Sequence, residues 1–461
     1  MAEYNVTNVT VASTLTVLLE SKKYATIRDI LVTMNPADVA AVFEGIKNRD
    51  SLPLLFRLLP KELAAETFVE MDTDDQELLI KGFSDSELRE VLNELYVYDA
   101  VDIIEEMPAN VVNRILAQSA PEMRKEINQI LQYPENSAGS IMTTEYVSLR
   151  PDMTVEEAIR RIRRTGVDKE TIYTCYITRG KMLLGFVTVK DLLLAQDDNT
   201  QLEDMMETNV ISVNTHTDQE QVAQMLSKYN FLALPVVDGD GRMVGIVTFD
   251  DAMDVMVDEA TEDMEIMGGM TPSDKTYLRS SAFDLFKHRI PWLMLLMVSA
   301  TFTGLIITGF ENQLAAQVIL TSFIPMLMDT GGNSGSQSSV TVIRAISLGE
   351  RQFADLFRGL WKEIRTAVMC GAVLAAACFG KIMLIDRLLM NNSEISVMVA
   401  VTVCLTMAAT VLVAKVIGCT LPILAKRLGF DPAVMASPFI TTIVDAISLL
   451  VYFAIACALL F

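Results

Sequence analysis

The amino-acid sequence predicts a multidomain membrane protein with an all-α superhelical N-terminal domain, two tandem α/β domains, an acidic connecting helix and an all-α transmembrane domain with five spans. Three observations support this prediction. A helix-start signal recurs every 24 residues near the N-terminus, a later segment is duplicated at an offset of 60 to 64 residues, and the last part holds several apolar runs long enough to cross a bilayer. The predicted domains are residues 1–132, 133–200, 201–256, 257–289 and 290–461.

The N-terminal domain is predicted from the 24-residue repeat. Its start signals are Pro36, Pro60, Ser84 and Pro108, each of which opens a helix-like segment. Proline in the first helical turn marks a helix start, and apolar residues four, seven and eight positions later give each segment a face that can stack on its neighbours. Residues 25–132 are therefore expected to form a small superhelical α-domain. Its expected role is regulatory or scaffolding, because it contains no catalytic arrangement of residues.

The two α/β domains are predicted from the duplication within residues 137–260. The segment Met142–Leu149 parallels Met206–Val213, and Gly185–Asp191 parallels Gly245–Asp251. Alternating and helical patterns in each copy indicate the order strand, helix, strand, strand, helix. In the first copy these elements are expected at residues 155–162 (helix), 171–177 and 184–189 (strands) and from Asp191 onward (helix).

This duplication resembles a tandem pair of cystathionine-β-synthase (CBS) domains. The resemblance places Thr188, Asp191, Thr248 and Asp251 at positions that touch an adenosine ligand in many such domains. It therefore implies ATP as a ligand at Thr248 and Asp251. A purely structural CBS pair is the alternative.

The acidic connecting helix is predicted from the run Asp250–Glu265, which has eight acids and no base. On a helix, Asp251, Asp254, Asp258 and Glu262 share one face, where like charges four residues apart repel each other. A solvated acidic surface is one interpretation. Because the run lies directly before the membrane segments and has no nearby base, we favour a site that is neutralised by cations.

Charge and composition exclude several functions. Residues 1–289 hold 50 of the 59 acids and 27 of the 37 bases, a net charge of −23, which repels nucleic acid and attracts cations. The six cysteines have no CxxC spacing and there are only two histidines. Any metal site is therefore expected to use oxygen ligands.

Five membrane spans are predicted. Four apolar runs are long enough by themselves, and a shorter run is extended by a polar stretch, 329–342, that we treat as uncharged. The runs are Ile290–Phe310, Leu314–Met328 with its extension, Ile364–Ile385, Val397–Leu424 and Ala436–Phe461.

Charges on the joins predict the orientation of these spans. The join Glu311–Gln313 has no base, whereas the joins after the second and fourth spans are basic. By the positive-inside rule the N-terminal half is cytoplasmic, Phe461 is outside, and the chain is a multi-pass protein of the cell membrane. The bases are Arg344, Arg351, Arg358, Lys362, Arg365, Lys426 and Arg427.

Asp445 is the main candidate for a functional residue. It lies near the middle of the last span, which otherwise carries no charge. A carboxylate at bilayer depth costs about 2.5–3.5 kcal/mol, so it normally faces a protein interior or a water-filled pathway. A buried acid paired with Lys or Arg of a neighbouring helix is the alternative. Lys415, inside the fourth span, bears on this choice: it either extends to the membrane interface or pairs with Asp445.

The segment Gly331–Gln337 (GlyGlyAsnSerGlySerGln) is a second candidate. Its glycines allow close backbone approach and exposed carbonyls beside a cavity, or close packing of helices through small residues. Together with Asp431-Pro-Ala and Pro438–Asp445, this motif resembles the MgtE family of magnesium channels and transporters, over essentially the whole chain.

The resemblance implies a homodimer whose pore is lined by the second and fifth spans, with Asp445 and Asn333 at the ion. It also implies a set of acids that bind cytosolic Mg²⁺: Asp218, Glu220, Asp251, Asp254, Glu259, Glu262, Asp263 and Asp431.

The function expected from these observations is a passive Mg²⁺ channel, not an enzyme, that is closed when cytosolic Mg²⁺ bridges its acidic domains. Mg²⁺ demands octahedral oxygen coordination and sheds water reluctantly, which suits carboxylate and amide ligands. Two alternatives stay open: a proton- or sodium-coupled transporter of divalent cations, and a membrane-anchored CBS protein that senses nucleotides.

Overall fold

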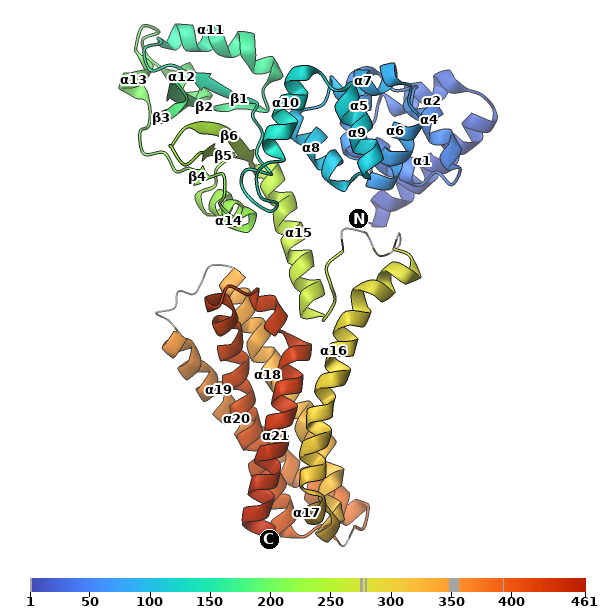
Figure 1. Cartoon of the computed structure of the whole chain (residues 1–461), viewed down its shortest axis with the longest axis vertical. Helices are drawn as coiled ribbons and strands as arrows, with labels where there is room; N and C mark the ends of the chain where they lie inside the picture. Colours follow the sequence, from blue (N-terminus) through green and yellow to red (C-terminus); the bar gives the residue numbers. More distant parts are fainter. Residues whose placement is uncertain (1, 274–276, 278–279, 348–355, 393) are drawn as a thin grey trace. The chain divides into compact units, whose positions relative to one another are not determined.

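The computed structural model describes residues 2–273, 277, 280–347, 356–392 and 394–461 (Figure 1), and Arg351 lies outside these ranges. The chain forms two compact units, Met1–Met256 and Val257–Phe461.

The N-terminal part of the first unit is entirely helical. Its helices are α1 (Ala2–Glu20), α2 (Tyr24–Leu31), α3 (Pro36–Glu44), η1 (Arg49–Ser51), α4 (Leu52–Phe56), α5 (Lys61–Val69), α6 (Thr73–Gly82), α7 (Asp85–Leu92), α8 (Val97–Glu106), α9 (Ala109–Gln118) and α10 (Pro121–Ile130). The four predicted start signals are confirmed. Pro36 is the first residue of α3, and Pro60, Ser84 and Pro108 are the N-caps of α5, α7 and α9.

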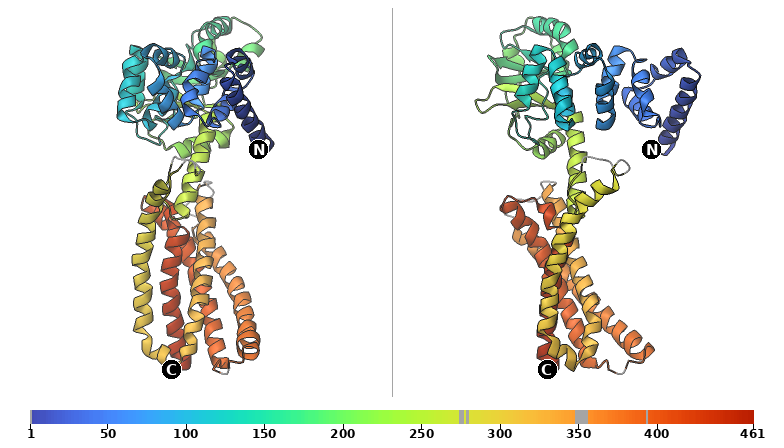
Figure 2. Two further views of the ribbon diagram at one scale, coloured as in Figure 1. Left: turned by 90° about the vertical axis from the view of Figure 1, so that its right-hand side faces the viewer. Right: turned by 45° about the vertical axis from the view of Figure 1, so that its right-hand side comes forward.

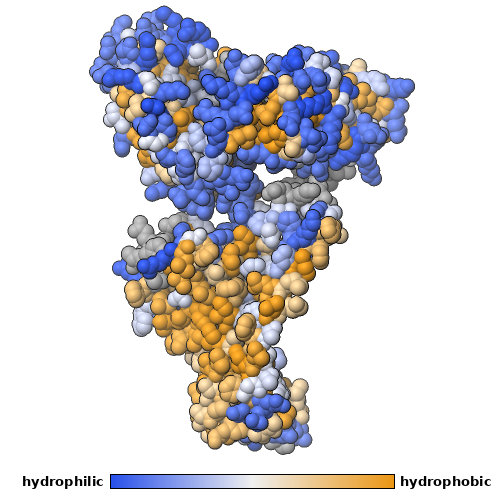
Figure 3. Space-filling view, viewed as in Figure 1, coloured by the Kyte–Doolittle hydropathy of each residue, from blue (hydrophilic) through white to orange (hydrophobic). Residues whose placement is uncertain are grey.

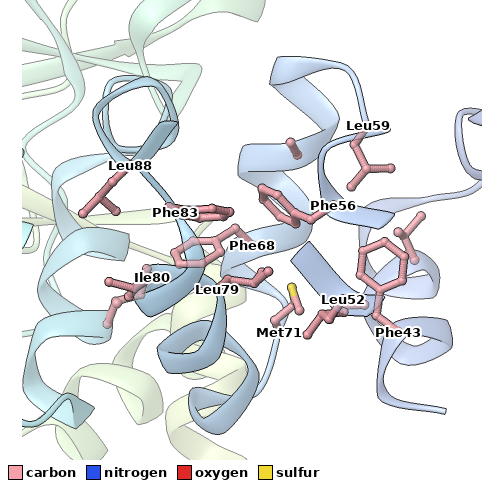
Figure 4. Packing of buried hydrophobic residues seen from close by; sticks show 14 of the residues in the cluster. Phe43, Leu52, Phe56, Leu59, Phe68, Met71, Leu79, Ile80, Phe83 and Leu88 are labelled. Atoms are coloured by element: carbon pink, nitrogen blue, oxygen red, sulfur yellow. The ribbon is translucent and has the colours of Figure 1, made fainter. Parts of the chain in front are cut away.

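The repeat units stack through their apolar faces. Helices α3, α5, α7 and α9 each contact the next one in this series. Figure 4 shows the core between them, where the rings of Phe56, Phe68 and Phe83 have centroids 5.3 to 6.4 Å apart. Leu79 and Ile80 beside these rings are almost completely buried. The 24-residue repeat thus builds one continuous core from units too small to fold alone.

The rest of the first unit holds the two α/β copies. The first has β1 (Tyr146–Leu149), α11 (Val155–Thr165), η2 (Gly166–Asp168), β2 (Thr171–Arg179), β3 (Met182–Thr188) and α12 (Val189–Leu194). The second has α13 (Leu202–Met205), β4 (Val213–Asn214), α14 (Gln219–Tyr229), β5 (Ala233–Val237), β6 (Met243–Thr248) and the start of α15 (Phe249–Met267). In each three-stranded sheet the first two strands are parallel and the last two antiparallel.

The predicted order of elements is confirmed, with one correction. Helix α12 starts at Val189 and not at Asp191, because Thr188 is its N-cap and accepts a hydrogen bond from the Asp191 backbone N–H. The duplicated glycines have a structural reason. A Cβ on Gly185 would lie 2.7 Å from Glu207 O, and one on Gly245 would lie 2.7 Å from Thr143 O, so each glycine admits a segment of the other copy.

The second unit is a bundle of long helices. They are α16 (Ala282–Gly309), α17 (Glu311–Ala316), η3 (Val318–Phe323), α18 (Ile324–Ser347), α19 (Leu356–Lys381), η5 (Ile382–Leu389), α20 (Val397–Arg427), η6 (Pro432–Met435) and α21 (Ser437–Leu460). Helix α20 contacts α18, α19 and α21, and α16 contacts α21, as the two views of Figure 2 also show. Hydrophobic side chains cover most of the surface of these helices in Figure 3.

Four of the described helices are long and apolar enough to cross a membrane: Ala282–Gly309, Phe357–Leu389, Val397–Arg427 and Pro432–Leu460. The prediction of five spans is not confirmed. The remaining candidate is α18, which corresponds to the second predicted span. It has 24 residues and is about 36 Å long, but it is more polar than the other four helices. Its predicted start at Leu314 is wrong. Residues 311–323 form α17 and η3, and α18 begins at Ile324, with Pro325 in its first turn.

Candidate functional site

The glycine-rich segment forms the buried face of α18. The segment is regular α-helix, so the expectation that it exposes backbone carbonyls beside a cavity is wrong. Gly331, Gly332 and Gly335 are buried, and a Cβ on any of them would come within 2.9 Å of a side chain of α20 or α21. Gly418 of α20 meets the backbone of Gly335 in the same way. Close packing of helices, the alternative interpretation, is what these glycines provide.

The opposite face of α18 is polar and exposed. Asp329, Asn333, Gln337 and Thr341 follow one another at intervals of four residues and all are exposed. This spacing puts them in one stripe along the helix, with successive side chains about 6 Å apart. The Asn333 Nδ2 donates a hydrogen bond to Asp329 Oδ1 at 3.0 Å. A polar stripe of this length on a helix of the membrane unit is suited to water or to a polar partner and not to lipid.

Asp445 lies on α21 at the level where α21 crosses α18. Val444 contacts both Gly331 and Gly335, which places the next residue, Asp445, at the level of Asn333. The Asp445 side chain is half-buried, and no lysine or arginine of the described ranges forms an ion pair with it. The charged group that acts on it electrostatically is Asp329. The alternative of a paired structural acid therefore has no partner in the part of the chain that the structure describes.

Lys415 neither extends to the membrane interface nor pairs with Asp445. Its side chain is 5% exposed, and its Nζ lies 3.4 Å from the Ser338 Oγ, to which it donates. The Ser338 hydroxyl donates in turn to Glu363 Oε2 at 2.7 Å. This network joins α20, α18 and α19, and it removes the objection that Lys415 raised against Asp445.

Acids also lie near the C-terminal end of α18. Asp263 of α15 accepts a hydrogen bond from Ser347 Oγ at 3.3 Å. Burial raises the pKa of Asp263, and the negative charges of Asp431 and Glu259 raise it further. Asp431 also caps η6, because its Oδ1 accepts from the Ala433 N–H at 2.8 Å. Asp263 thus interacts electrostatically with two other acids predicted to bind Mg²⁺, although no group of three such ligands in the described ranges is arranged to hold a metal ion. Glu262, on the same helix, is exposed.

A separate acidic group occurs in the first unit. Burial raises the pKa of Asp251, and Asp250 and Asp254 add to the effect, while a hydrogen bond from Thr248 opposes it. Burial also raises the pKa of Asp254. The Thr248 hydroxyl donates to Asp251 Oδ2, so the two residues predicted to bind ATP pair with each other at the start of α15.

Two further acids of this group are not among the predicted Mg²⁺ ligands. Asp99 of α8 is 7% exposed, and burial with the charge of Asp251 raises its pKa to about 7. Glu170 has a buried Oε2 without a hydrogen-bond partner among the described residues, and burial raises its pKa to about 7, with Asp251 and Asp250 contributing. No local spacing connects these residues, since only the fold brings the charges of Asp99, Glu170 and Asp251 near one another. A bound cation would lower the free-energy cost of keeping these buried carboxylates ionised.

Asp218 and Glu220 have local roles at the start of α14. Asp218 is the N-cap, and its Oδ1 accepts from the backbone N–H groups of Glu220 at 3.0 Å and Gln221 at 3.3 Å. Glu220 Oε1 accepts from Gln224 Nε2 at 3.1 Å. The donors at all of these candidate positions are carboxylate, hydroxyl and amide oxygens, which Mg²⁺ prefers over sulfur or imidazole ligands.

Three parts of the chain match known families. Residues 324–455 match the family MgtE, divalent cation transporter. Residues 34–136 match the MgtE intracellular N domain, and residues 138–198 and 202–258 match the CBS domain.

The similarity to individual proteins extends over nearly the whole length. The magnesium transporter MgtE of Thermus thermophilus is 35% identical over 439 residues, which cover 94% of this chain and 95% of the relative. The magnesium transporter MgtE of Bacillus subtilis is 30% identical over 96% of both chains.

Among solved structures, the cytosolic domain of the Mg²⁺ channel MgtE in complex with ATP matches 53% of this chain and 99% of its own, with a TM-score of 0.50 and 36% identity. The soluble part of a magnesium transporter matches 54% of this chain and 98% of its own, with a TM-score of 0.50 and 30% identity.

Proposed function

Because the chain belongs to the MgtE family of magnesium transporters, we propose that it is a homodimeric channel of the cell membrane that passes Mg²⁺ passively and closes when cytosolic Mg²⁺ rises. The chain is a membrane transporter with an intracellular N domain, and it is not an enzyme. The observation that carries the proposal is Asp445, a carboxylate in the middle of a membrane-length helix without a lysine or arginine partner among the described residues.

The proposed pathway runs along the polar stripe of α18 and past Asp445. Two features support this route. Asn333 and Asp445 lie at the same level of two crossing helices, and the stripe is exposed in the single chain. A second copy facing this stripe would enclose it, so that each copy contributes one Asp445 carboxylate and one Asn333 amide to the ion. In this arrangement α18 also crosses the membrane as the second span in chain order, which gives five spans in all.

The proposed gate is closed by Mg²⁺ that bridges acids of the cytosolic domains. Two unscreened carboxylates 4 Å apart repel each other by about 4 kcal/mol at an effective dielectric constant of 20. A bound divalent cation converts that repulsion into attraction, and a few such sites shift a two-state gate strongly. Burial is the main cause of the raised pKa values of Asp263, Asp251 and Asp254, and the charges of neighbouring acids add to it, which supports this part of the proposal. The proposed ligands are Asp218, Glu220, Asp251, Asp254, Glu259, Glu262, Asp263 and Asp431.

Uptake by proteoliposomes that contain the purified chain tests this function. We expect Mg²⁺ to enter down its own gradient, and the initial rate to fall about tenfold or more when the internal Mg²⁺ is raised from micromolar to several millimolar. Ionophores that collapse proton and sodium gradients should leave the uptake unchanged. Uptake that stops with either gradient would instead indicate a coupled transporter.

ATP binding to the CBS pair is a further part of the proposal, supported by the ATP complex of the similar cytosolic domain. We expect a fragment of residues 137–263 to bind ATP, and Thr248→Val and Asp251→Ala each to weaken the binding about tenfold through a lost hydrogen bond. Isothermal titration calorimetry measures this. Thr248→Ser, which keeps the hydroxyl that pairs with Asp251, should retain the affinity. The absence of any heat of ATP binding to the unchanged fragment would refute the proposal.

A further inference from the structure

Asp329 is a carboxylate within the stretch 329–342, and the prediction that this stretch is uncharged is therefore wrong. It is the sixth residue of α18 and the one charged residue between Ile324 and Ile343. A lone acid on a helix of the membrane unit is costly unless it faces water, protein or an ion. Asp329 is exposed in the single chain, and it opens the polar stripe that continues with Asn333.

The hydrogen bond between these two residues determines how the Asn333 amide points. Asn333 Nδ2 donates to Asp329 Oδ1 at 3.0 Å. With its nitrogen engaged, the amide keeps its Oδ1 available as an acceptor or metal ligand. Mg²⁺ and its water shell require oxygen acceptors or ligands, and an amide nitrogen cannot take that role. Asp329 therefore holds Asn333 in the orientation in which its oxygen is free for the ion.

The crossing of α18 and α21 sets the order of the charges along the pathway. Gly335 contacts Ile440 and Val444, whereas Gly331 contacts Val444 and Ser448, so the two helices run in opposite directions. Asp329 precedes Gly331 on α18 and therefore lies at a level beyond Asp445, toward the end of α21 that leads to Phe461. In the proposed orientation this is the outer side. Asp329 and Asp445 also act on each other electrostatically.

We propose that Asp329 is a second charged residue of the ion pathway, on the outer side of Asp445, where it attracts the incoming Mg²⁺ and keeps the Asn333 oxygen directed to it. This inference rests on the proposed function. In a dimer the two copies of Asp329 form an acidic ring that the ion meets before the two copies of Asp445. Rings of acidic side chains favour cations, and a chain of weak sites lets the ion move on from each.

Initial rates of Mg²⁺ uptake by proteoliposomes over a range of external Mg²⁺ concentrations test the proposal. We expect Asp329→Asn to raise the half-saturating concentration about 30-fold, the effect of removing one charge from each of two subunits, both about 8 Å from a divalent ion in water, while the maximal rate stays within about twofold. Asp329→Ser, with a smaller uncharged side chain, should give the same shift. Asp329→Glu should restore the half-saturating concentration to within about twofold of the unchanged chain.

Glu394→Gln is the matched control. Glu394 is an exposed acid of the same unit that lies outside the helices. Glu394→Gln removes the same charge as Asp329→Asn, and it should leave the half-saturating concentration and the maximal rate unchanged. The proposal is refuted if Asp329→Asn keeps the original half-saturating concentration, or if only the maximal rate falls, which would indicate a structural role. The proposed function fails separately, if Asp445→Asn conducts normally. If Asp445→Asn abolishes Mg²⁺ uptake while Asp329→Asn leaves it normal, this inference is overturned and the proposed function stands.

Discussion

Replacing Asp445 with Asn is expected to reduce Mg²⁺ flux about 100-fold or more, while the chain still inserts in the membrane and assembles. The substitution keeps the size of the side chain and removes the one charge on α21. Losing a partner of a desolvated charge interaction costs about 2–5 kcal/mol, and in a dimer both copies lose it at the same ion. Because no described lysine or arginine pairs with Asp445, its removal leaves no cation uncompensated inside the bundle.

Uptake of Mg²⁺ by proteoliposomes measures the flux, and size-exclusion chromatography in detergent measures the assembly. Asp445→Glu keeps the charge and should retain a substantial part of the flux, whereas Glu394→Gln should retain all of it. Normal flux through Asp445→Asn would place the pathway elsewhere. A variant that no longer assembles would instead make Asp445 a structural residue, and the Asp445→Glu result would then decide between charge and packing.

Neutralising the acids of α15 is expected to remove the dependence of the gate on cytosolic Mg²⁺. Without bound ions these acids repel one another and favour the open state, and with bound ions they are bridged and favour the closed state. Uncharged replacements lose both effects, so open probability should change little between micromolar and several-millimolar inner Mg²⁺, whatever its absolute level. The variant combines Asp251→Asn, Asp254→Asn, Glu259→Gln and Glu262→Gln.

Single-channel recording from inside-out patches measures this dependence directly. A matched control removes the same number of charges from exposed positions of the helical N-terminal domain. It should keep the steep closure by Mg²⁺, which would show that position and not net charge is decisive. The control combines Asp29→Asn, Glu62→Gln, Glu66→Gln and Glu122→Gln. If the α15 variant still closes steeply, the sensor lies elsewhere, and the buried Asp99 is the next candidate.

Local signals predicted much of the fold. Pro36 and Ser84 start helices where the repeat placed them, because capping depends on a few neighbouring residues. The succession of strands and helices in the α/β copies was predicted for the same reason, since side-chain alternation is a property of each strand. The same reasoning failed at Leu314, where an apolar run was read as the start of a span and proved to be a short helix with a 3₁₀ turn.

The candidate site was predicted only in part. Asp445 could be found from its charge within an apolar run, which needs no knowledge of the neighbours. Asp329 escaped notice because it lies in a polar stretch, and its importance depends on Asn333 and on the crossing with α21. Glu170 carries no sequence signal at all, since its burial near the charges of Asp99 and Asp251 involves residues far apart in the sequence.

By itself the sequence determined the family, the repeats, the helix starts and the long apolar helices, because each of these depends on residue type and spacing along the chain. Only the tertiary structure decided which face of each helix is buried. It turned the α18 glycines toward α20 and α21, left the stripe beginning at Asp329 exposed, and buried Lys415 against Ser338. These outcomes depend on how the shapes and charges of whole helices fit together. Because these helices are far apart in the sequence, no local pattern predicts which face is buried.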